Sequence, residues 1–224
     1  MIRKTNFIPG NYYHIYNRGT DKREIFLCDS DYFRFIVLLY ICNNTERVDL
    51  FEKSSLEKIL EMKRKNVFID IGAYCLMPNH FHLLVKERKS NGISNFMEKL
   101  GTAYAMYFNR KYERSGNLFQ GRFKAELADK DEYLRYLFSY IHFNPIKLME
   151  PEWKEKGIKN PAGADEFLKI YRWSSYNFYA GNKTNDPILN IKEFPEYFES
   201  FNTFNSFADE WLSRTNRTDK GSPC

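Results

Sequence analysis

Apolar positions along residues 1–150 follow two spacings, one typical of strands and the other of helices. Aromatic and β-branched residues fill 12–16 and end at the turn signal Asn17-Arg18-Gly19, which predicts a first strand. A dense apolar run at 32–41 then follows Ser30 and Asp31, either of which can cap a helix. Its apolar density predicts a helix buried between other elements.

Residues 46–65 are rich in Glu and Lys, with Leu and Ile at roughly helical spacing, and they predict a solvated amphipathic insertion. The pattern then predicts a hairpin of two strands at 67–75 and 80–85, followed by a long helix at 93–112. A short strand at 122–127 and a last helix from Asp129 or Asp131 to Pro145 complete the predicted order. This order is that of the ferredoxin-like split βαβ arrangement. We therefore expect an α+β fold, with helices on one face of an antiparallel sheet.

The pattern becomes looser beyond Pro151, where aromatic, Pro-bearing and Asn-bearing segments follow one another. We predict one domain at 1–150 and a C-terminal extension at 151–224. The polar tail from Ser213 to Cys224 is expected to be disordered. With 224 residues and 43% hydrophobic content, the chain can build one sizeable core.

The charge and the cysteines restrict the class of protein only loosely. The formal charge of +5 is compatible with a nucleic-acid partner without requiring one. The four cysteines show no Cys-x-x-Cys spacing, and the N-terminus lacks a long apolar core, so we expect a reduced, intracellular protein. The longest apolar stretch, near 36–42, is too short to span a bilayer.

Two of the four histidines, His80 and His82, are placed one residue apart on a predicted strand. Because side chains alternate along a strand, both should lie on the same face of the sheet. Two neutral imidazoles on one face can share a metal ion. A bare His-x-His is more often a pair of half-buried sheet histidines, so this pair alone does not decide between the two interpretations.

The last predicted helix carries Tyr140 and Asn144, whose spacing of four places a phenol and an amide on one side of the helix. Tyr133 and Tyr136 follow nearly the same stripe. An aromatic packing stripe that ends at an Asn-Pro turn is the alternative explanation.

Together, these motifs resemble the single-tyrosine HUH transposases, especially the REP-associated tyrosine transposases and similar insertion-sequence transposases. The resemblance covers roughly residues 8–150, in the family's order and with similar spacing. It rests on the segments Tyr13–Gly19, Leu76–Val85, Gln120–Lys124 and Tyr140–Pro145. It implies that 1–150 is an HUH catalytic domain.

The resemblance also implies roles for the paired motifs. His80, His82 and Asn144 would bind a divalent ion, Mg²⁺ or Mn²⁺, with the two imidazoles favouring Mn²⁺ or other transition metals. Tyr140 would attack phosphorus, leaving a 5′-phosphotyrosine and a free 3′-hydroxyl, so that DNA is nicked and later rejoined.

Tyrosines on the preceding helix, Tyr104, Tyr107 and Tyr112, are competing nucleophiles. Tyr104 and Tyr107 are followed at i+4 by Phe108 and Lys111, which offer no oxygen ligand. Tyr140 is the preferred nucleophile, because it combines the Tyr-Ile-x-x-Asn-Pro context of the family that the chain resembles with Asn144 at i+4, which could bind the same ion.

The expected partner is single-stranded or hairpin DNA, bound by a monomer or homodimer in the bacterial cytoplasm, at the nucleoid when on DNA. The expected DNA contacts are Arg18, Gln120, Arg122 and Lys124. A ferredoxin-like nucleic-acid-binding protein without catalysis is the alternative, although both histidines, Tyr140 and Asn144 are all present. A phosphodiesterase with two His-x-Ser/Thr motifs is excluded, because the sequence contains no such pair.

Overall fold

The structure is a computed structural model that describes residues 6–46, 59, 64, 66–181 and 185–195. Its centre is an antiparallel sheet of four strands in the order β2-β3-β1-β4. The strands are β1 (Tyr12–Arg18), β2 (Ile69–Met77), β3 (His80–Glu87) and β4 (Lys124–Leu127). This sheet confirms the predicted α+β class and the ferredoxin-like strand order.

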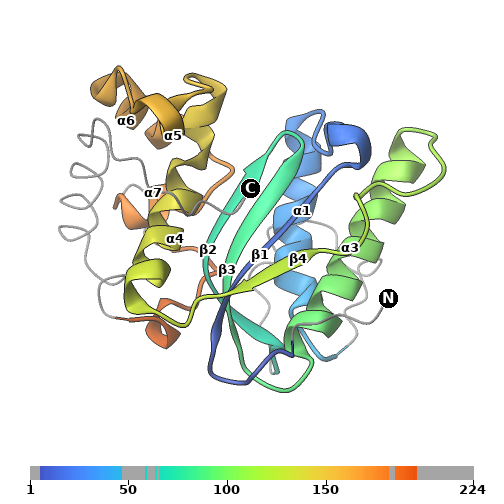
Figure 1. Ribbon diagram of the computed structural model, residues 1–224. Coiled ribbons are helices and arrows are strands. Elements are labelled where there is room, and N and C mark those ends of the chain that lie inside the picture. The colour runs from blue at the N-terminus through green and yellow to red at the C-terminus, as the bar shows by residue number, and fades with distance from the viewer. Residues whose placement is uncertain (1–5, 47–58, 60–63, 65, 182–184, 196–224) are drawn as a thin grey trace.

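One face of the sheet is covered by α1 (Asp29–Cys42) and α3 (Gly92–Lys111), as Figure 1 shows. Ile15 of β1 and Phe81 and Leu83 of β3 are buried in the same apolar cluster as residues of the two helices. Because side chains alternate along β3, His80 and His82 lie on the opposite face from Phe81 and Leu83.

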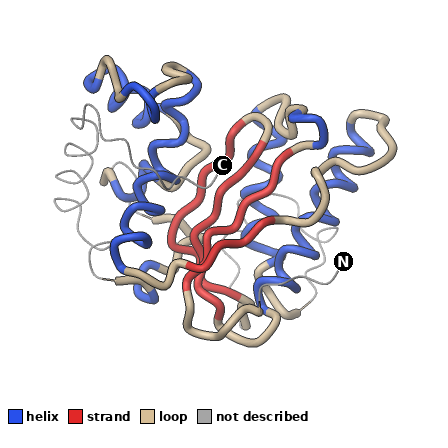
Figure 2. Tube along the Cα trace, viewed as in Figure 1, coloured by secondary structure: helices blue, strands red, loops and turns tan. Residues whose placement is uncertain are grey.

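The opposite face is covered as well, which the predicted one-sided arrangement did not include. Figure 2 shows a second group of helices across the sheet from α1 and α3. The elements on this side are α4 (Asp131–Phe143), η2 (Asn144–Leu148), α5 (Trp153–Lys156), α6 (Pro161–Ile170) and α7 (Tyr176–Tyr179). Ala73 and Cys75 of β2 and Leu84 of β3 supply the apolar surface on which this layer packs.

Residues that follow α6 cover the outer edge of β2. The Leu76 amide donates to the Trp173 carbonyl at 2.9 Å, and the Ser175 amide donates to the Tyr74 carbonyl at 3.0 Å. An open edge strand exposes unpaired backbone groups to other chains, and these bonds remove part of that exposure. The described part of 151–195 therefore packs directly on the sheet.

The starts of two helices differ from the predicted ones. The N-cap of α1 is Cys28, so Ser30 and Asp31 lie inside its first turn. The Asp31 carboxylate is used instead by the Leu27 amide at 2.9 Å and by the Lys111 ammonium at 2.6 Å. The N-cap of α4 is Lys130, and its side chain forms no capping hydrogen bond.

The insertion predicted at 46–65 and the tail 213–224 lie almost wholly outside the described residues. Within the described part of the chain, the helices are too short or too polar to cross a membrane.

Candidate active site

His80 and His82 project from β3 toward α4. Their rings meet edge to face, with centroids 4.9 Å apart. His82 is 5% exposed, whereas His80 is half-buried. The strand thus holds two imidazoles next to each other at the boundary between the core and the surface.

Tyr140 and Asn144 lie opposite these rings. The Tyr140 ring stands edge-on to His82, with centroids 5.3 Å apart. Asn144 is the first residue of η2, directly after α4, and its amide Nδ2 lies 3.5 Å from His82 Nε2. Helical spacing therefore brings the phenol and the amide to the same imidazole, as the sequence predicted.

Contacts at the Nδ1 atoms fix the tautomers of both rings. Asn79 Oδ1 accepts from His80 Nδ1 at 2.6 Å, because an amide oxygen has no proton to donate. His14 Nε2 lies 2.9 Å from His82 Nδ1, and Glu126 Oε2 lies 4.0 Å from His14 Nδ1. The carboxylate favours a proton on His14 Nδ1, so His14 Nε2 accepts from His82 Nδ1–H. The lone pairs of His80 and His82 are thus on their Nε2 atoms.

Glu126 is held in its ionised form on β4. The facing His14 ring, followed by hydrogen bonds from Tyr16 and Tyr133, lowers the pKa of Glu126. The phenols of Tyr16 and Tyr133 donate to its two oxygens at 2.8 and 3.0 Å. These contacts fix the position of the carboxylate beside His14.

Burial keeps the imidazoles neutral. Burial lowers the pKa of His80 to about 4, and it lowers the pKa of His82 well below its usual value, with the neighbouring His80 charge adding to the effect. Burial also lowers the pKa of His14. At neutral pH these rings therefore have the uncharged form that metal binding requires.

The donor atoms fit a divalent cation. Asn144 Oδ1 is buried and has no hydrogen-bond partner among the described residues, which is unusual for a buried amide oxygen. Within the described ranges, no group of three or more His, Cys, Asp or Glu side chains is placed to hold a metal ion. A site here would therefore combine imidazole nitrogens with an amide oxygen, a donor set that suits Mn²⁺ and tolerates Mg²⁺.

Lys154 on α5 is a neighbour that the sequence motifs did not indicate. Its Nζ donates to Tyr140 Oη at 3.0 Å. The sequence motifs likewise gave no sign that His14 contacts His82. For His14, only the pairing register of β1 with β3 reveals the contact.

The competing tyrosines are remote from the histidines. Tyr104 is fully buried in the cluster formed with α1, on the other face of the sheet. Tyr107 and Tyr112 donate to the Asp31 carboxylate at 3.0 and 2.7 Å. Their place on α3 or, for Tyr112, directly after it puts the sheet between these phenols and His82.

The predicted DNA contacts lie together at one end of β1 and β4. The side-chain Nε of Arg18 donates to Oε1 of Gln120, and the backbone N–H of Gln120 donates to the backbone carbonyl of Arg18 at 2.8 Å. Both side chains are exposed, as are Arg122 and Lys124. Lys124 Nζ lies 5.7 Å from the ring centroid of Tyr16, whose strand position pairs with His82. The structure thus places cationic and polar side chains on the strands and loop beside the histidines.

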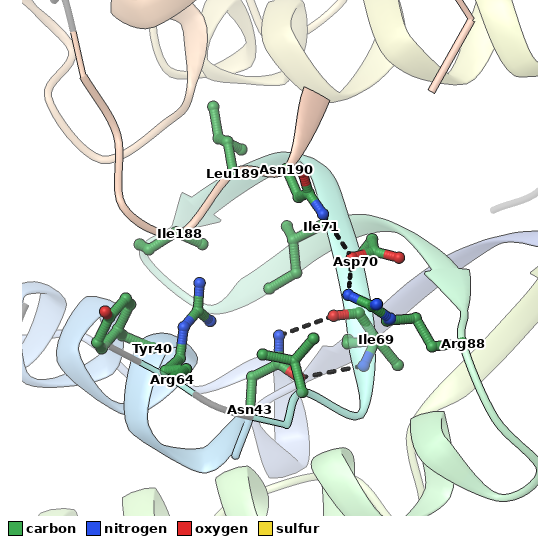
Figure 3. A pocket seen from close by; sticks show the side chains of 11 residues that line it. Tyr40, Asn43, Arg64, Ile69, Asp70, Ile71, Arg88, Ile188, Leu189 and Asn190 are labelled. Carbon is green, nitrogen blue, oxygen red and sulfur yellow. Dashed lines mark hydrogen bonds and ion pairs between the residues drawn. The ribbon is translucent and has the colours of Figure 1, made fainter. Parts of the chain in front are cut away.

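A separate cavity of about 430 Å³ lies between β2, the end of α1 and residues 188–190 (Figure 3). Its Asp70 carboxylate contacts the Arg88 guanidinium at 3.3 Å and the Asn190 amide at 2.8 Å. The contact with Asn190 joins β2 to the C-terminal segment, and the contact with Arg88 joins it to the end of β3. The histidines do not line this cavity.

Comparisons with known proteins agree with the geometry. Residues 36–144 match the family model described as Transposase IS200 like. Among solved structures, the chain is similar to a REP-associated tyrosine transposase bound to a REP hairpin, with a TM-score of 0.50 and 12% identity over 87% of this chain and 94% of that chain. Another is the tRNA(His) guanylyltransferase of Saccharomyces cerevisiae, with a TM-score of 0.36 and 11% identity over 88% of this chain and 86% of that one. No curated protein matches the chain. The family match supports the resemblance to transposases, and the structural match shows a similar fold.

Proposed function

We propose that this chain is a transposase of the IS200-like kind, which nicks and rejoins single-stranded or hairpin DNA through a 5′-phosphotyrosine intermediate on Tyr140. The observation that carries the proposal is the approach of Tyr140 to His82, with ring centroids 5.3 Å apart, beside the Asn144 amide. A nucleophile, two neutral imidazoles and an amide oxygen are thereby gathered on one face of the sheet.

His80, His82 and Asn144 would hold the divalent ion that the family resemblance implies. When bound, such an ion polarises a phosphate and stabilises the negative charge that develops on its oxygens. The protein's own contribution is the fixed orientation of the Nε2 atoms, which follows from the contacts of Asn79 and His14.

Tyr140 supplies the covalent chemistry. A bond forms between its Oη and phosphorus, and the bond from phosphorus to the 3′ oxygen breaks. The phenol proton passes to water, and the departing 3′ oxygen takes up a proton to become a hydroxyl. The phosphotyrosine retains an energetic phosphodiester, so the reverse attack by a 3′-hydroxyl rejoins the strand.

DNA binding is assigned to the exposed surface around Arg18, Gln120, Arg122 and Lys124. Cationic side chains there suit phosphates, and nearby aromatic rings suit unpaired bases. A hairpin is the favoured ligand because the similar REP-associated transposase is bound to a REP hairpin.

The proposal is tested by mixing the protein and Mn²⁺ with end-labelled single-stranded hairpin DNA from the flanks of its own gene. Denaturing electrophoresis should show a covalent protein–DNA band for the wild type and none for Tyr140→Phe. Tyr136→Phe is the matched control. The Tyr136 ring stacks on the Tyr140 ring, with centroids 6.0 Å apart, but no role in the reaction is assigned to Tyr136. An adduct from Tyr140→Phe would refute the nucleophile. DNA binding by the wild type without any adduct would support the non-catalytic alternative.

A further inference from the structure

The C-terminal extension brings a cation to the proposed nucleophile. Lys154 Nζ lies 3.0 Å from Tyr140 Oη and 4.1 Å from the centroid of the same ring. We infer that Lys154 is a positioning residue, which orients the Tyr140 phenol and stabilises the negative charge on its oxygen as the phosphorus bond forms. This inference rests on the proposed function of Tyr140.

The short helix α5 is anchored where this contact needs it. Trp153, the residue before Lys154, is 4% exposed and packs in the apolar cluster that also contains Tyr140. Lys154 itself is half-buried, so its ammonium is less hydrated than a surface lysine and interacts more strongly with nearby charge. The lysine is therefore held beside the phenol by packing.

Tyr140, the partner of Lys154, also stands edge-on to two imidazoles. Its ring centroid lies 5.3 Å from that of His82 and 6.0 Å from that of His14. The ammonium on Tyr140 Oη therefore belongs to the same group of side chains to which the proposed function assigns the reaction.

The chemical role is electrostatic, and it requires no proton transfer from the lysine. The ammonium remains protonated and donates a hydrogen bond to Oη, while the phenol proton passes to water. Negative charge that develops on Oη before the bond to phosphorus is complete is then stabilised by a charge-assisted hydrogen bond. Removal of one such preorganised donor typically lowers the rate of a chemical step by about 100-fold.

The test compares Lys154→Met, Lys154→Arg and the control Lys156→Met. Methionine keeps most of the apolar stem of lysine, so packing beside Trp153 is preserved. Lys156 lies on the same helix, but it is exposed and pairs with Glu152 at 2.7 Å. The measurements are the single-turnover rate of adduct formation at saturating hairpin DNA and, separately, the dissociation constant for that DNA.

We expect Lys154→Met to lower the saturating rate by about 100-fold with little change in DNA affinity. Arginine should restore much of the rate, and Lys156→Met should react like the wild type. Equal saturating rates for wild type and Lys154→Met would overturn the inference, as would a loss confined to DNA affinity, which would make Lys154 a phosphate contact. If the wild type forms no adduct, the proposed function fails and this inference fails with it. If the wild type forms the adduct and Lys154→Met forms it equally fast, only this inference fails, so the two failures are distinguishable.

Discussion

His14 Nε2 and His82 Nδ1 are 2.9 Å apart, joined across the paired strands β1 and β3. This contact has a direction, because Glu126 lies on the other side of the His14 ring and favours a proton on Nδ1. His14 therefore accepts from His82, and His82 Nε2 retains its lone pair. Contacts of this kind set the basicity and orientation of metal-binding histidines.

His14→Phe is expected to weaken Mn²⁺ binding by about 10- to 100-fold, because His82 loses the partner that fixes its ring. Isothermal titration calorimetry with Mn²⁺ measures this directly. His142→Gln is the matched control, since His142 is buried on α4 but bonds Ser175 instead of the candidate site. Equal Mn²⁺ affinities for His14→Phe and the wild type would show that the contact has no influence on the metal.

Removal of the proposed ligands should separate cleavage from DNA binding. His80→Ala or His82→Ala should abolish adduct formation, while DNA affinity measured by gel shift stays largely intact because phosphate contacts dominate it. Asn144→Ala should be milder, since water can replace a neutral oxygen ligand. Chelator should abolish the adduct in the wild type. Undiminished nicking in chelator would refute the metal assignment.

Stability should fall in acid partly through His142. Burial lowers the pKa of His142 to about 3, whereas the unfolded chain has the ordinary value near 6.5. Below pH 6.5 the unfolded state therefore binds a proton at His142 that the folded state does not bind. The stabilisation of the folded state that neutral His142 provides at higher pH is then lost. Between pH 7.5 and 5.5, the wild type should lose about 1.4 kcal/mol more free energy of unfolding than His142→Gln. Urea denaturation at both pH values measures this difference, and parallel losses would contradict it.

Local patterns predicted the sheet because period-two alternation and turn residues are properties of adjacent positions. The first strand was expected at 12–16 and spans Tyr12–Arg18, and the long helix was expected at 93–112 and spans Gly92–Lys111. The helix α4 was predicted, but the order of the elements did not show that it covers the opposite face of the sheet. The rest of the second layer was missed because the pattern beyond Pro151 is too irregular to show that its apolar residues pack on β2.

The candidate site was predictable only where its residues are close in sequence. His80 with His82, and Tyr140 with Asn144, have spacings that place each pair on one face. Two contacts join distant segments instead. His14 meets His82 through strand register, and Lys154 meets Tyr140 because α5 packs beside α4. No sequence spacing reports such tertiary contacts.

The surface formed by Arg18 and Gln120 provides the last prediction. Arg18 ends β1, and its guanidinium donates to the Gln120 amide oxygen while remaining exposed. One guanidinium that contacts a phosphate releases about one counterion. Arg18→Ala should therefore weaken hairpin binding and reduce the slope of the logarithm of the binding constant against the logarithm of the salt concentration by about one. Gln120→Ala should weaken binding less and leave the slope unchanged, because an amide carries no charge.

The measurement is the dissociation constant for a fluorescently labelled hairpin at several salt concentrations. Lys169→Ala serves as the control, because Lys169 is a cation on α6 that pairs with Asp165 at 2.5 Å. This control removes the same unit of charge from the protein, so a general charge effect would lower the salt dependence for both variants equally. Only a local phosphate contact lowers it for Arg18→Ala alone. Identical slopes for Arg18→Ala and the wild type would remove Arg18 from the DNA-binding surface.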